Sequence, residues 1–203
     1  MDLLLRTYNV PDGTLFVDGK DVNRVSIRSV RQACAYVPQD NFLFSATIAE
    51  NIRFYAPEAT MEDIEQAAKL ADIYDSIQEF PDGFQTQVGE RGVTLSGGQK
   101  QRISIARALV KRPRILILDD ALSAVDAKTE QDIWQSLRGV FAGGTSGIIV
   151  AHRVSALQNC DEILVLERGR IVERGTHEQL MALGGQYAST ARKQESGEVD
   201  DDE

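Results

Sequence analysis

The sequence is short of cysteine, of aromatic residues and of long apolar runs, and each shortage excludes a class of protein. Its two cysteines, Cys34 and Cys160, lie within or beside apolar stretches, which suits buried thiols in a reducing compartment better than a disulfide framework. Neither belongs to a CxxC or Cys/His pattern, so the spacing indicates no metal cage. The longest apolar runs, such as Ile115 to Leu118, are far shorter than the roughly 20 residues of a membrane-spanning helix.

Positive charge is also scarce. Lys and Arg number 22 against 31 Asp and Glu among 203 residues, which gives a formal net charge of -9. Nucleic acid is therefore not an expected partner, because phosphate backbones are held by clustered Lys and Arg. Part of the negative charge lies in Glu195 to Glu203. We expect residues 191–203 to form an acidic, disordered tail behind a domain of residues 1–190.

What the sequence does contain is an alternation of strand-like and helix-like segments. Strands are expected at 14–18, 34–37, 115–118, 147–150 and 162–166, and helices at 60–71, 97–110 and 127–140. Such an alternation predicts an α/β fold with a parallel sheet. Near the end of the chain, Thr176 and Gln179 form a capping box and predict a last helix.

The first chemical motif is Leu95-Ser96-Gly97-Gly98-Gln99, at the start of an expected helix. A serine at the N-cap, two glycines in the first turn and the free N–H groups of the helix start make a ready anion site. Glycine also lets a phosphate approach the backbone closely. Taken alone, these residues fit an ordinary serine-capped helix equally well.

The second motif is an apolar strand that ends in two carboxylates, Asp119 and Asp120. Open parallel sheets bind their ligands at the carboxyl edge, where such a strand would deliver these acids. Asp119 is placed there to hold Mg²⁺, directly or through water. The alternative is a buried strand followed by two solvated acids.

In their order along the chain, these two motifs and three others resemble those of ABC transporter ATPases. They are YVPQD at 36–40, which resembles the Q-loop, LSGGQKQRISIARAL at 95–109, the signature, LILDD at 116–120, Walker B, SAVD at 123–126, the D-loop, and IIVAH at 148–152, the H-loop. The resemblance implies a P-loop NTPase core with a parallel sheet and an inserted helical subdomain at about 42–110. It also implies ATP and Mg²⁺ as cofactors.

The resemblance gives individual residues a role. Asp119 and Gln39 would bind Mg²⁺, and Gln39 would also sense the γ-phosphate. Asp120 stands at the position of the catalytic base, and His152 at that of a histidine that contacts the γ-phosphate. On spacing alone, a histidine after a buried strand is more often a structural capping residue. Contacts to a nucleotide across a dimer interface would come from Ser96, Gly97, Gly98, Gln99 and Asp126.

Thr86 to Gly92 resembles the segment through which exporters contact the coupling helices of their membrane domain. Together with Phe44 to Ile52, this segment favours an exporter over an importer. The implied partners are the coupling helices of a transmembrane domain and a second ABC ATPase domain. The implied location is the cytoplasmic face of a membrane. The alternative for these loops is a pair of solvated turns with no partner.

The first departure from the family is that the sequence has no GxxxxGK[ST] phosphate loop. Gly13 to Asp21 has one residue too many between its glycines and Asp after Lys20, and it is better explained as a β-hairpin. Met1 to Tyr8 resembles the stretch that follows the Walker A helix, and we expect it to be the end of a helix. The resemblance thus implies a domain that is truncated after Walker A and lacks the N-terminal β-subdomain and the P-loop strand. The chain alone would then be inactive.

The second departure is Asp120, where active members of the family carry Glu. This pattern resembles the degenerate half of a heterodimeric, multidrug-type exporter, in which one subunit has an impaired base and an intact signature. The runner-up interpretation is a non-catalytic module whose role is to donate its signature to a partner. A chromosome-maintenance ATPase is disfavoured, because no sustained heptads lie between Gln39 and Leu95 and the charge is acidic.

Overall fold

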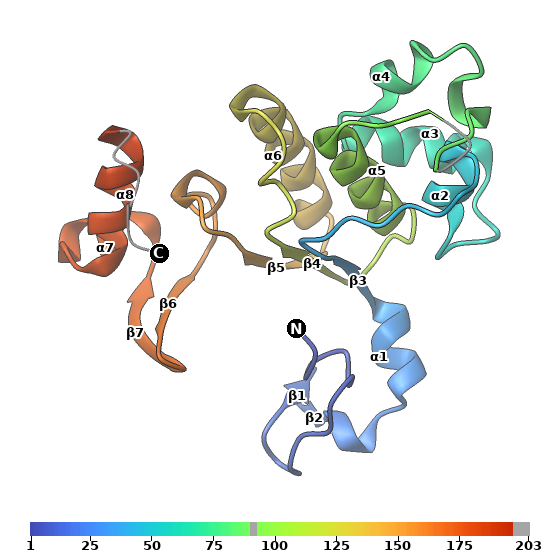
Figure 1. Cartoon of the computed structure of the whole chain (residues 1–203). Coiled ribbons are helices and arrows are strands. Elements are labelled where there is room, and N and C mark those ends of the chain that lie inside the picture. Colours follow the sequence, from blue (N-terminus) through green and yellow to red (C-terminus); the bar gives the residue numbers. More distant parts are fainter. Residues whose placement is uncertain (90–92, 197–203) are drawn as a thin grey trace. The chain divides into compact units, whose positions relative to one another are not determined.

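The computed structural model describes residues 1–89 and 93–196. The chain divides into two compact units, a first unit of residues Met1–Val150 and a second unit that begins at Ala151. Figure 1 shows both, and each is described by itself.

The first unit is built on a three-stranded parallel sheet in the order β3-β4-β5. The strands are β3 (Cys34–Val37), β4 (Ile115–Asp119) and β5 (Ser146–Val150). Tyr36 pairs with Ile117 in register, and Asp119 pairs with Val150. Three consecutive residues of the central strand, Leu116 to Leu118, are buried, as expected for a parallel strand covered on both faces. The predicted parallel α/β fold is confirmed.

Helices cover the two faces of this sheet differently. Figure 1 shows α5 (Gly97–Leu109) and α6 (Ala127–Ala142) on one side, and α1 (Ile27–Ala33) with the N-terminal segment on the other. On the α1 side, Val30, Cys34 and Ile117 form a buried cluster. The predicted helices at 97–110 and 127–140 are confirmed, whereas α1 was not predicted.

Four more helices of the first unit lie between β3 and α5 in the chain. They are α2 (Ile48–Arg53), α3 (Met61–Leu70), α4 (Tyr74–Gln78) and η2 (Gly83–Gln85). Capping boxes begin α2 at Thr47 and α3 at Thr60, which fixes these starts locally. Because α5 packs against both α2 and α3 as well as β3, it is the central element of the first unit.

The N-terminal segment differs from one expectation and confirms another. Residues 1–8 form consecutive turns rather than a helix, with one bond of helical spacing from Leu5 N–H to Met1 carbonyl (3.2 Å). So short a segment does not recover the cost of helix nucleation. Next, β1 (Phe16–Val17) and β2 (Lys20–Asp21) form an antiparallel hairpin, as predicted for this stretch. A short 3-10 helix, η1 (Val22–Arg24), follows.

The second unit is a hairpin packed against two helices. Its elements are η3 (Val154–Ala156), β6 (Ile163–Glu167), β7 (Arg170–Gly175), α7 (His177–Leu183) and α8 (Gln186–Ser196). β6, at the predicted strand 162–166, pairs antiparallel with β7, and the predicted Thr176–Gln179 capping box is confirmed. Its core consists of Val154, Ile163, Leu180, Tyr187 and Ala191.

The expected start of a disordered tail at residue 191 is wrong. α8 continues to Ser196, because Ala191 is buried in the core of the second unit. The Glu173 carboxylate also accepts hydrogen bonds from the N–H groups of Gln186 and Tyr187 and so caps the start of the helix. Residues 197–203 lie outside the described residues.

None of the helices within residues 1–89 and 93–196 combines the length and the hydropathy that a membrane span requires.

Candidate functional site

The carboxyl ends of β3 and β4 bring three of the predicted site residues together. The Gln39 side-chain amide donates a hydrogen bond to Asp120 Oδ2 (3.3 Å), and Asp119 leaves the same edge of β4. Parallel strands end at a common edge, so residues about 80 positions apart in sequence become neighbours. The sequence placed Asp119 and Asp120 at this edge, and the structure brings Gln39 to the same edge.

A fourth residue at this edge was missed by sequence reasoning. The Tyr36 hydroxyl donates to Asp119 Oδ2 (2.9 Å). Partial burial, this hydrogen bond and the charge of Asp119 raise the pKa of Tyr36 to about 12, so the phenol stays protonated and keeps donating. Tyr36 thus fixes one oxygen of Asp119. The pairing of β3 with β4 was the only signal that could have revealed it.

These side chains fit a Mg²⁺–nucleotide complex. Mg²⁺ prefers oxygen ligands and is commonly held by one or two carboxylates, with the remaining ligands from phosphates and water. In the part of the chain that the structure describes, no group of three or more His, Cys, Asp and Glu could hold a metal ion by itself. Asp119 and the amide oxygen of Gln39 would therefore be the protein ligands of an ion that is completed by phosphate oxygens.

Asp120 itself has an unusual backbone. Its φ is 47°, a left-handed conformation that Asp tolerates better than most residues. Its N–H donates to the Val150 carbonyl (2.8 Å), and its own carbonyl accepts from the Ser123 hydroxyl (2.9 Å). The turn thus carries the Asp120 carboxylate out of the strand, toward Gln39.

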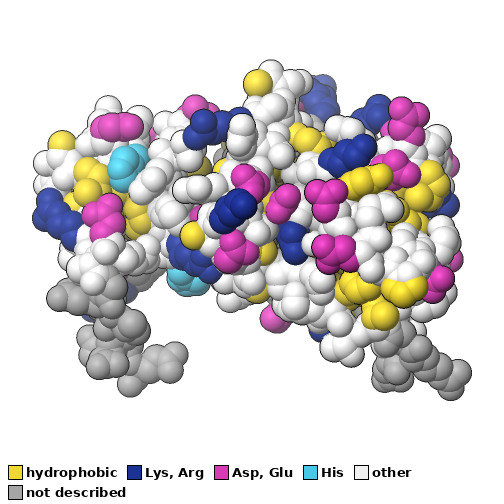
Figure 2. All heavy atoms as spheres, turned by 90° about the horizontal axis from the view of Figure 1, so that it is seen from above, with side chains coloured by type: hydrophobic (Ala, Val, Ile, Leu, Met, Phe, Trp, Pro, Cys, Tyr) yellow, Lys and Arg dark blue, Asp and Glu magenta, His cyan; other side chains and the backbone are white. Residues whose placement is uncertain are grey.

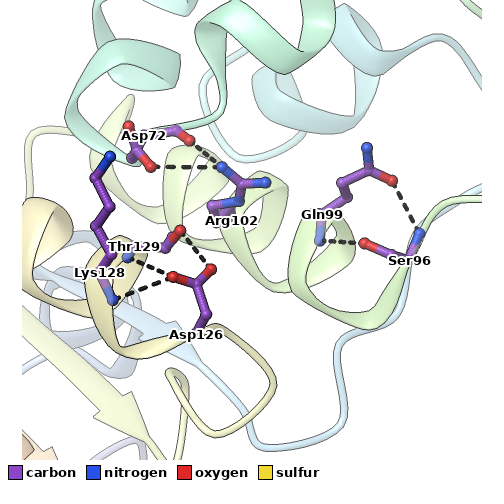
Figure 3. A network of polar contacts seen from close by, with 7 residues as sticks. All are labelled: Asp72, Ser96, Gln99, Arg102, Asp126, Lys128 and Thr129. Atoms are coloured by element: carbon purple, nitrogen blue, oxygen red, sulfur yellow. Dashed lines mark hydrogen bonds and ion pairs between the residues drawn. The ribbon is translucent and has the colours of Figure 1, made fainter.

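The signature motif begins α5 as predicted. Ser96 is the N-cap, and its hydroxyl accepts from the Gln99 N–H (3.2 Å) while the Gln99 side chain accepts from the Ser96 N–H (2.9 Å). Figure 3 shows this reciprocal pair. Ser96 and Gly97 are exposed, so the first turn of a 13-residue helix faces outward. Such a start can bind an anion through its N–H groups.

Gly98 has a packing role that the sequence did not reveal. A Cβ atom at this position would lie 3.1 Å from the Ala124 carbonyl oxygen, whereas one at Gly97 would lie 3.6 Å from the Ala124 Cβ. The first of these contacts is too close and the second is ordinary. Gly98 therefore lets α5 approach the turn that follows Asp120.

Asp126 is the N-cap of α6. Its carboxylate accepts from the N–H groups of Lys128 (3.1 Å) and Thr129 (3.0 Å) and from the Thr129 hydroxyl (2.7 Å), as Figure 3 shows. The hydrogen bonds with Thr129 are the main reason that the pKa of Asp126 lies below its ordinary value. Asp126 is thus an anion that caps its own helix, a role the D-loop assignment did not include.

His152 lies in the second unit, in the loop before η3. A side chain of α8 hydrogen-bonds to the backbone of this loop: Gln194 donates to the His152 carbonyl (2.7 Å) and accepts from the Val154 N–H (2.8 Å). Sequence reasoning gave Gln194 no role, because nothing in the pattern of α8 indicates this contact.

The comparisons with known proteins show which family the chain belongs to. A family model described as ABC transporter matches residues 1–123. The chain belongs to the ABC transporter family. ATP-binding cassette sub-family B member 6 of Xenopus tropicalis is 51% identical over 96% of this chain and 23% of its own length. The heavy metal tolerance protein of Schizosaccharomyces pombe is 46% identical over 98% of this chain and 24% of its own length.

Among solved structures, a bacterial Atm1-family ABC exporter with ATP bound is 45% identical, with a TM-score of 0.90 over 96% of this chain and 34% of the exporter chain. This ABC transporter chain thus has the fold of an exporter ATPase. It spans about a quarter of the length of the curated relatives named above.

The two loops that resemble those of exporters meet in the first unit. The Ile48 N–H donates to the Thr86 carbonyl (3.0 Å), and the Val88 N–H donates to the Ala46 carbonyl (3.0 Å). Residues 90–92 of the second loop lie outside the described residues. The structure therefore joins Ala46–Ile48 and Thr86–Val88 into one surface.

Next to this surface lies a group of aromatic rings, called here the aromatic cluster and consisting of Phe42, Phe44, Phe54 and Tyr55. Their ring centroids are 5.1, 4.1 and 5.0 Å apart in succession. Phe42 is 67% exposed, Phe54 48% and Tyr55 55%. In Figure 2, hydrophobic side chains also gather visibly over the helical side of the first unit. So large an exposed aromatic group indicates a contact surface.

Arg107, near the end of α5, holds the aromatic cluster from inside. Its guanidinium donates to the Phe42 carbonyl and to the carbonyl and side chain of Asn51, each at 2.8 Å, and lies 5.5 Å from the Phe44 ring centroid. Burial lowers the pKa of Arg107. The sequence showed Arg107 only as part of the signature helix, and its long-range partners were not predictable.

Proposed function

We propose that this chain is the ATP-binding part of an ABC exporter and works with a second ABC ATPase domain in a head-to-tail dimer. The observation that carries the proposal is the convergence of Gln39, Asp119 and Asp120 at one sheet edge, combined with an outward-facing signature turn at Ser96. The three residues at the sheet edge suit the Mg²⁺–nucleotide of the chain's own site. The signature turn suits the nucleotide that is bound by the partner.

Within this proposal each residue has a distinct task. Asp119 and Gln39 would hold the Mg²⁺, which would supply neutralisation of the charge on the phosphates. Asp120 orients and polarises the attacking water. Ser96, Gly97, Gly98 and Gln99 present hydroxyl, amide and backbone N–H groups to the partner's nucleotide, and Asp126 lies in the loop that faces the partner. His152 contacts the γ-phosphate.

Asp120 makes this the slow site of a heterodimer. Aspartate is one methylene shorter than glutamate, and a displacement of roughly 1 Å can cost about 10²-fold in rate. The hydrogen bond from Gln39 also engages the carboxylate. In a subunit that also supplies a P-loop, this nucleotide site would bind ATP and turn it over slowly, while the signature completes the partner's fast site.

The test is a mixed dimer in which this subunit alone carries Asp120→Glu. We expect a rise in ATP turnover of up to about 10²-fold at the altered site, measured as single-site hydrolysis with the partner's own base inactivated. Unchanged hydrolysis and transport would count against a degenerate site.

The chain by itself is proposed to be inactive, because its 203 residues contain no GxxxxGK[ST] sequence. That loop supplies the backbone N–H groups and the Lys that bind β- and γ-phosphates. Purified chain should therefore show no metal-dependent ATP hydrolysis above a blank. Robust turnover would contradict the proposal.

The membrane partner is proposed to dock on the aromatic cluster and the adjoining loops of the helical subdomain, residues 42–110, within a partial ATPase domain of residues 1–190. This places the chain at the cytoplasmic face of a membrane, held by the coupling helices of a transmembrane domain. A cysteine at Phe42 should then crosslink to a coupling helix in the assembled exporter, whereas one at exposed Glu62 should not.

A second candidate is a non-catalytic module that only donates its signature. It is favoured by the intact capping geometry at Ser96 beside the shortened acid at Asp120. In the assembled dimer, Ser96→Arg abolishes turnover under either proposal. Asp120→Asn further lowers turnover only if this subunit also hydrolyses ATP, so the second substitution separates the two.

A further inference from the structure

Gln101 is a buried polar residue with no role in the function proposed above. It lies on the second turn of α5 and is 1% exposed. Its side-chain oxygen accepts from the Ala124 N–H (2.9 Å). Its side-chain nitrogen lies 3.3 Å from both the Asp120 carbonyl oxygen and the Ser123 hydroxyl. Both the oxygen and the nitrogen of the Gln101 side-chain amide therefore form hydrogen bonds with one five-residue turn.

This turn, Asp120 to Ala124, connects two functional segments. At its start is the proposed water-orienting acid, held with a φ of 47°, and just after it comes the loop proposed to face the partner. The left-handed conformation is less favourable for a non-glycine residue, although Asp tolerates it better than most. The bonds from Gln101 and Ser123 to the Asp120 carbonyl help to hold Asp120 in it.

The approach of α5 to the turn is equally specific. Gly98 precedes Gln101 by three residues and so lies on the same side of the helix. A Cβ atom there would come within 3.1 Å of the Ala124 carbonyl oxygen. One side of α5 therefore approaches the turn closely at Gly98, which has no side chain, and is hydrogen-bonded to it at Gln101.

We propose that Gln101 is a positioning residue that locks the Asp120–Ala124 turn to the signature helix. The turn that carries the acid for the chain's own nucleotide is then held against the helix whose start carries the signature for the partner's nucleotide. This inference rests on the proposed function for the identity of the two nucleotide sites, but not for the lock itself.

The lock can be tested without nucleotide, by hydrogen exchange of the Ala124 amide. Gln101→Met keeps the length of the side chain and removes its hydrogen bonds. We expect the Ala124 amide to exchange about tenfold faster or more, since an intramolecular hydrogen bond is worth about 1 kcal/mol and an unsatisfied buried group costs more. Amides of α3 should be unchanged and report that the fold is intact.

Two further variants keep the test decisive. Gln101→Glu retains an acceptor for the Ala124 N–H and should retain its protection. Equal acceleration in Gln101→Glu and Gln101→Met would overturn the lock, because the amide would then report packing rather than this bond. Ser104→Ala is the matched control: Ser104 lies on the same helix, is buried, and its hydroxyl has no hydrogen-bond partner among the described residues. It should leave Ala124 unaffected.

The coupling is tested by equilibrium binding of a fluorescent ATP analogue to the assembled dimer, with this chain as part of a subunit that also supplies a P-loop. Gln101→Met in this subunit alone should weaken binding at both composite sites, and Ser104→Ala at neither. Weakening at one site only would overturn the coupling and leave the proposed function standing. Failure of the unsubstituted dimer to bind the analogue would contradict the proposed function, while the exchange result at Ala124 would still stand.

Discussion

Two glutamines, one in each unit, hold the backbone of a loop that carries a proposed site residue. Gln101 holds the turn that begins at Asp120, and Gln194 holds the loop of His152. Each uses its amide oxygen for an N–H and its amide nitrogen for a carbonyl. The chemistry is the same, but Gln101 is buried and Gln194 is exposed on α8.

The difference in burial decides what each contact is worth. A buried donor or acceptor that loses its partner pays the full cost of desolvation, whereas water replaces a lost partner at the surface. The Asp120 turn is therefore fixed as firmly as the core. The His152 loop is held in place but can be released at little cost.

The largest expected effect is on the buried side of this comparison. Gln101→Met should lower the free energy of unfolding by about 2–3 kcal/mol, because backbone groups of the turn lose their partners. Urea denaturation measures it, with Ser104→Ala as the control for loss of a buried polar atom from α5. A change below about 0.5 kcal/mol would show that the turn is held by something else.

Next in size is the close approach of α5. Gly98→Ala should cost about 1–3 kcal/mol through overpacking against the Ala124 carbonyl, whereas Gly97→Ala should cost less, since its Cβ meets only an ordinary contact. Thermal unfolding of the pair gives the contrast directly. Equal unfolding temperatures for the two variants would mean that the turn shifts to accommodate the added methyl group at residue 98.

A smaller effect is expected on the exposed side. Gln194→Met should change the free energy of unfolding by about 0.5 kcal/mol or less, as is usual at the surface. The Val154 amide should nevertheless exchange faster, because its acceptor is gone. If Gln194→Met destabilised the chain as much as Gln101→Met, burial would not be the deciding variable.

The smallest effect is one of pH. The lowered pKa of Asp126 means that its capping of α6 is present above the ordinary value of 3.8 and is lost as the pH falls through the lowered pKa. In the second unit, burial raises the pKa of Tyr187, so its contribution is lost instead as the pH rises beyond 10.0. At low pH, the difference in stability between the parent chain and Asp126→Ala should therefore become smaller. At high pH, the difference in stability between the parent chain and Tyr187→Phe should become smaller. Unfolding of each pair, followed by circular dichroism across the pH range, checks this contrast. The contrast would be wrong if both stability differences narrowed at the same end of the pH range.

What could be predicted from the sequence was what neighbouring residues determine. The capped starts of α3, α5 and α7 follow from a residue and its partner three positions later. The buried β4 follows from a continuous apolar run. Both signals are local, and the motif order then placed Gln39, Asp119 and Asp120 at one edge.

What could not be predicted depends on pairs distant in sequence. Tyr36 meets Asp119 across 83 positions and Arg107 meets Phe42 across 65, and no local pattern marks either. The helix end expected at residues 1–8 does not form either, and Leu4 and Leu5 of this segment pack against the distant cluster of Val30, Cys34 and Ile117.

α5 also has a mechanical consequence. Its 13 residues form a rod about 20 Å long. The rod begins at Ser96, is bonded at Gln101 to the Asp120 turn, and grips the aromatic cluster through Arg107 near its far end. The described residues of the rod form one continuous helix with no break between these points. A displacement of the Phe42 backbone is therefore transmitted along α5 to Ser96 through one uninterrupted helix.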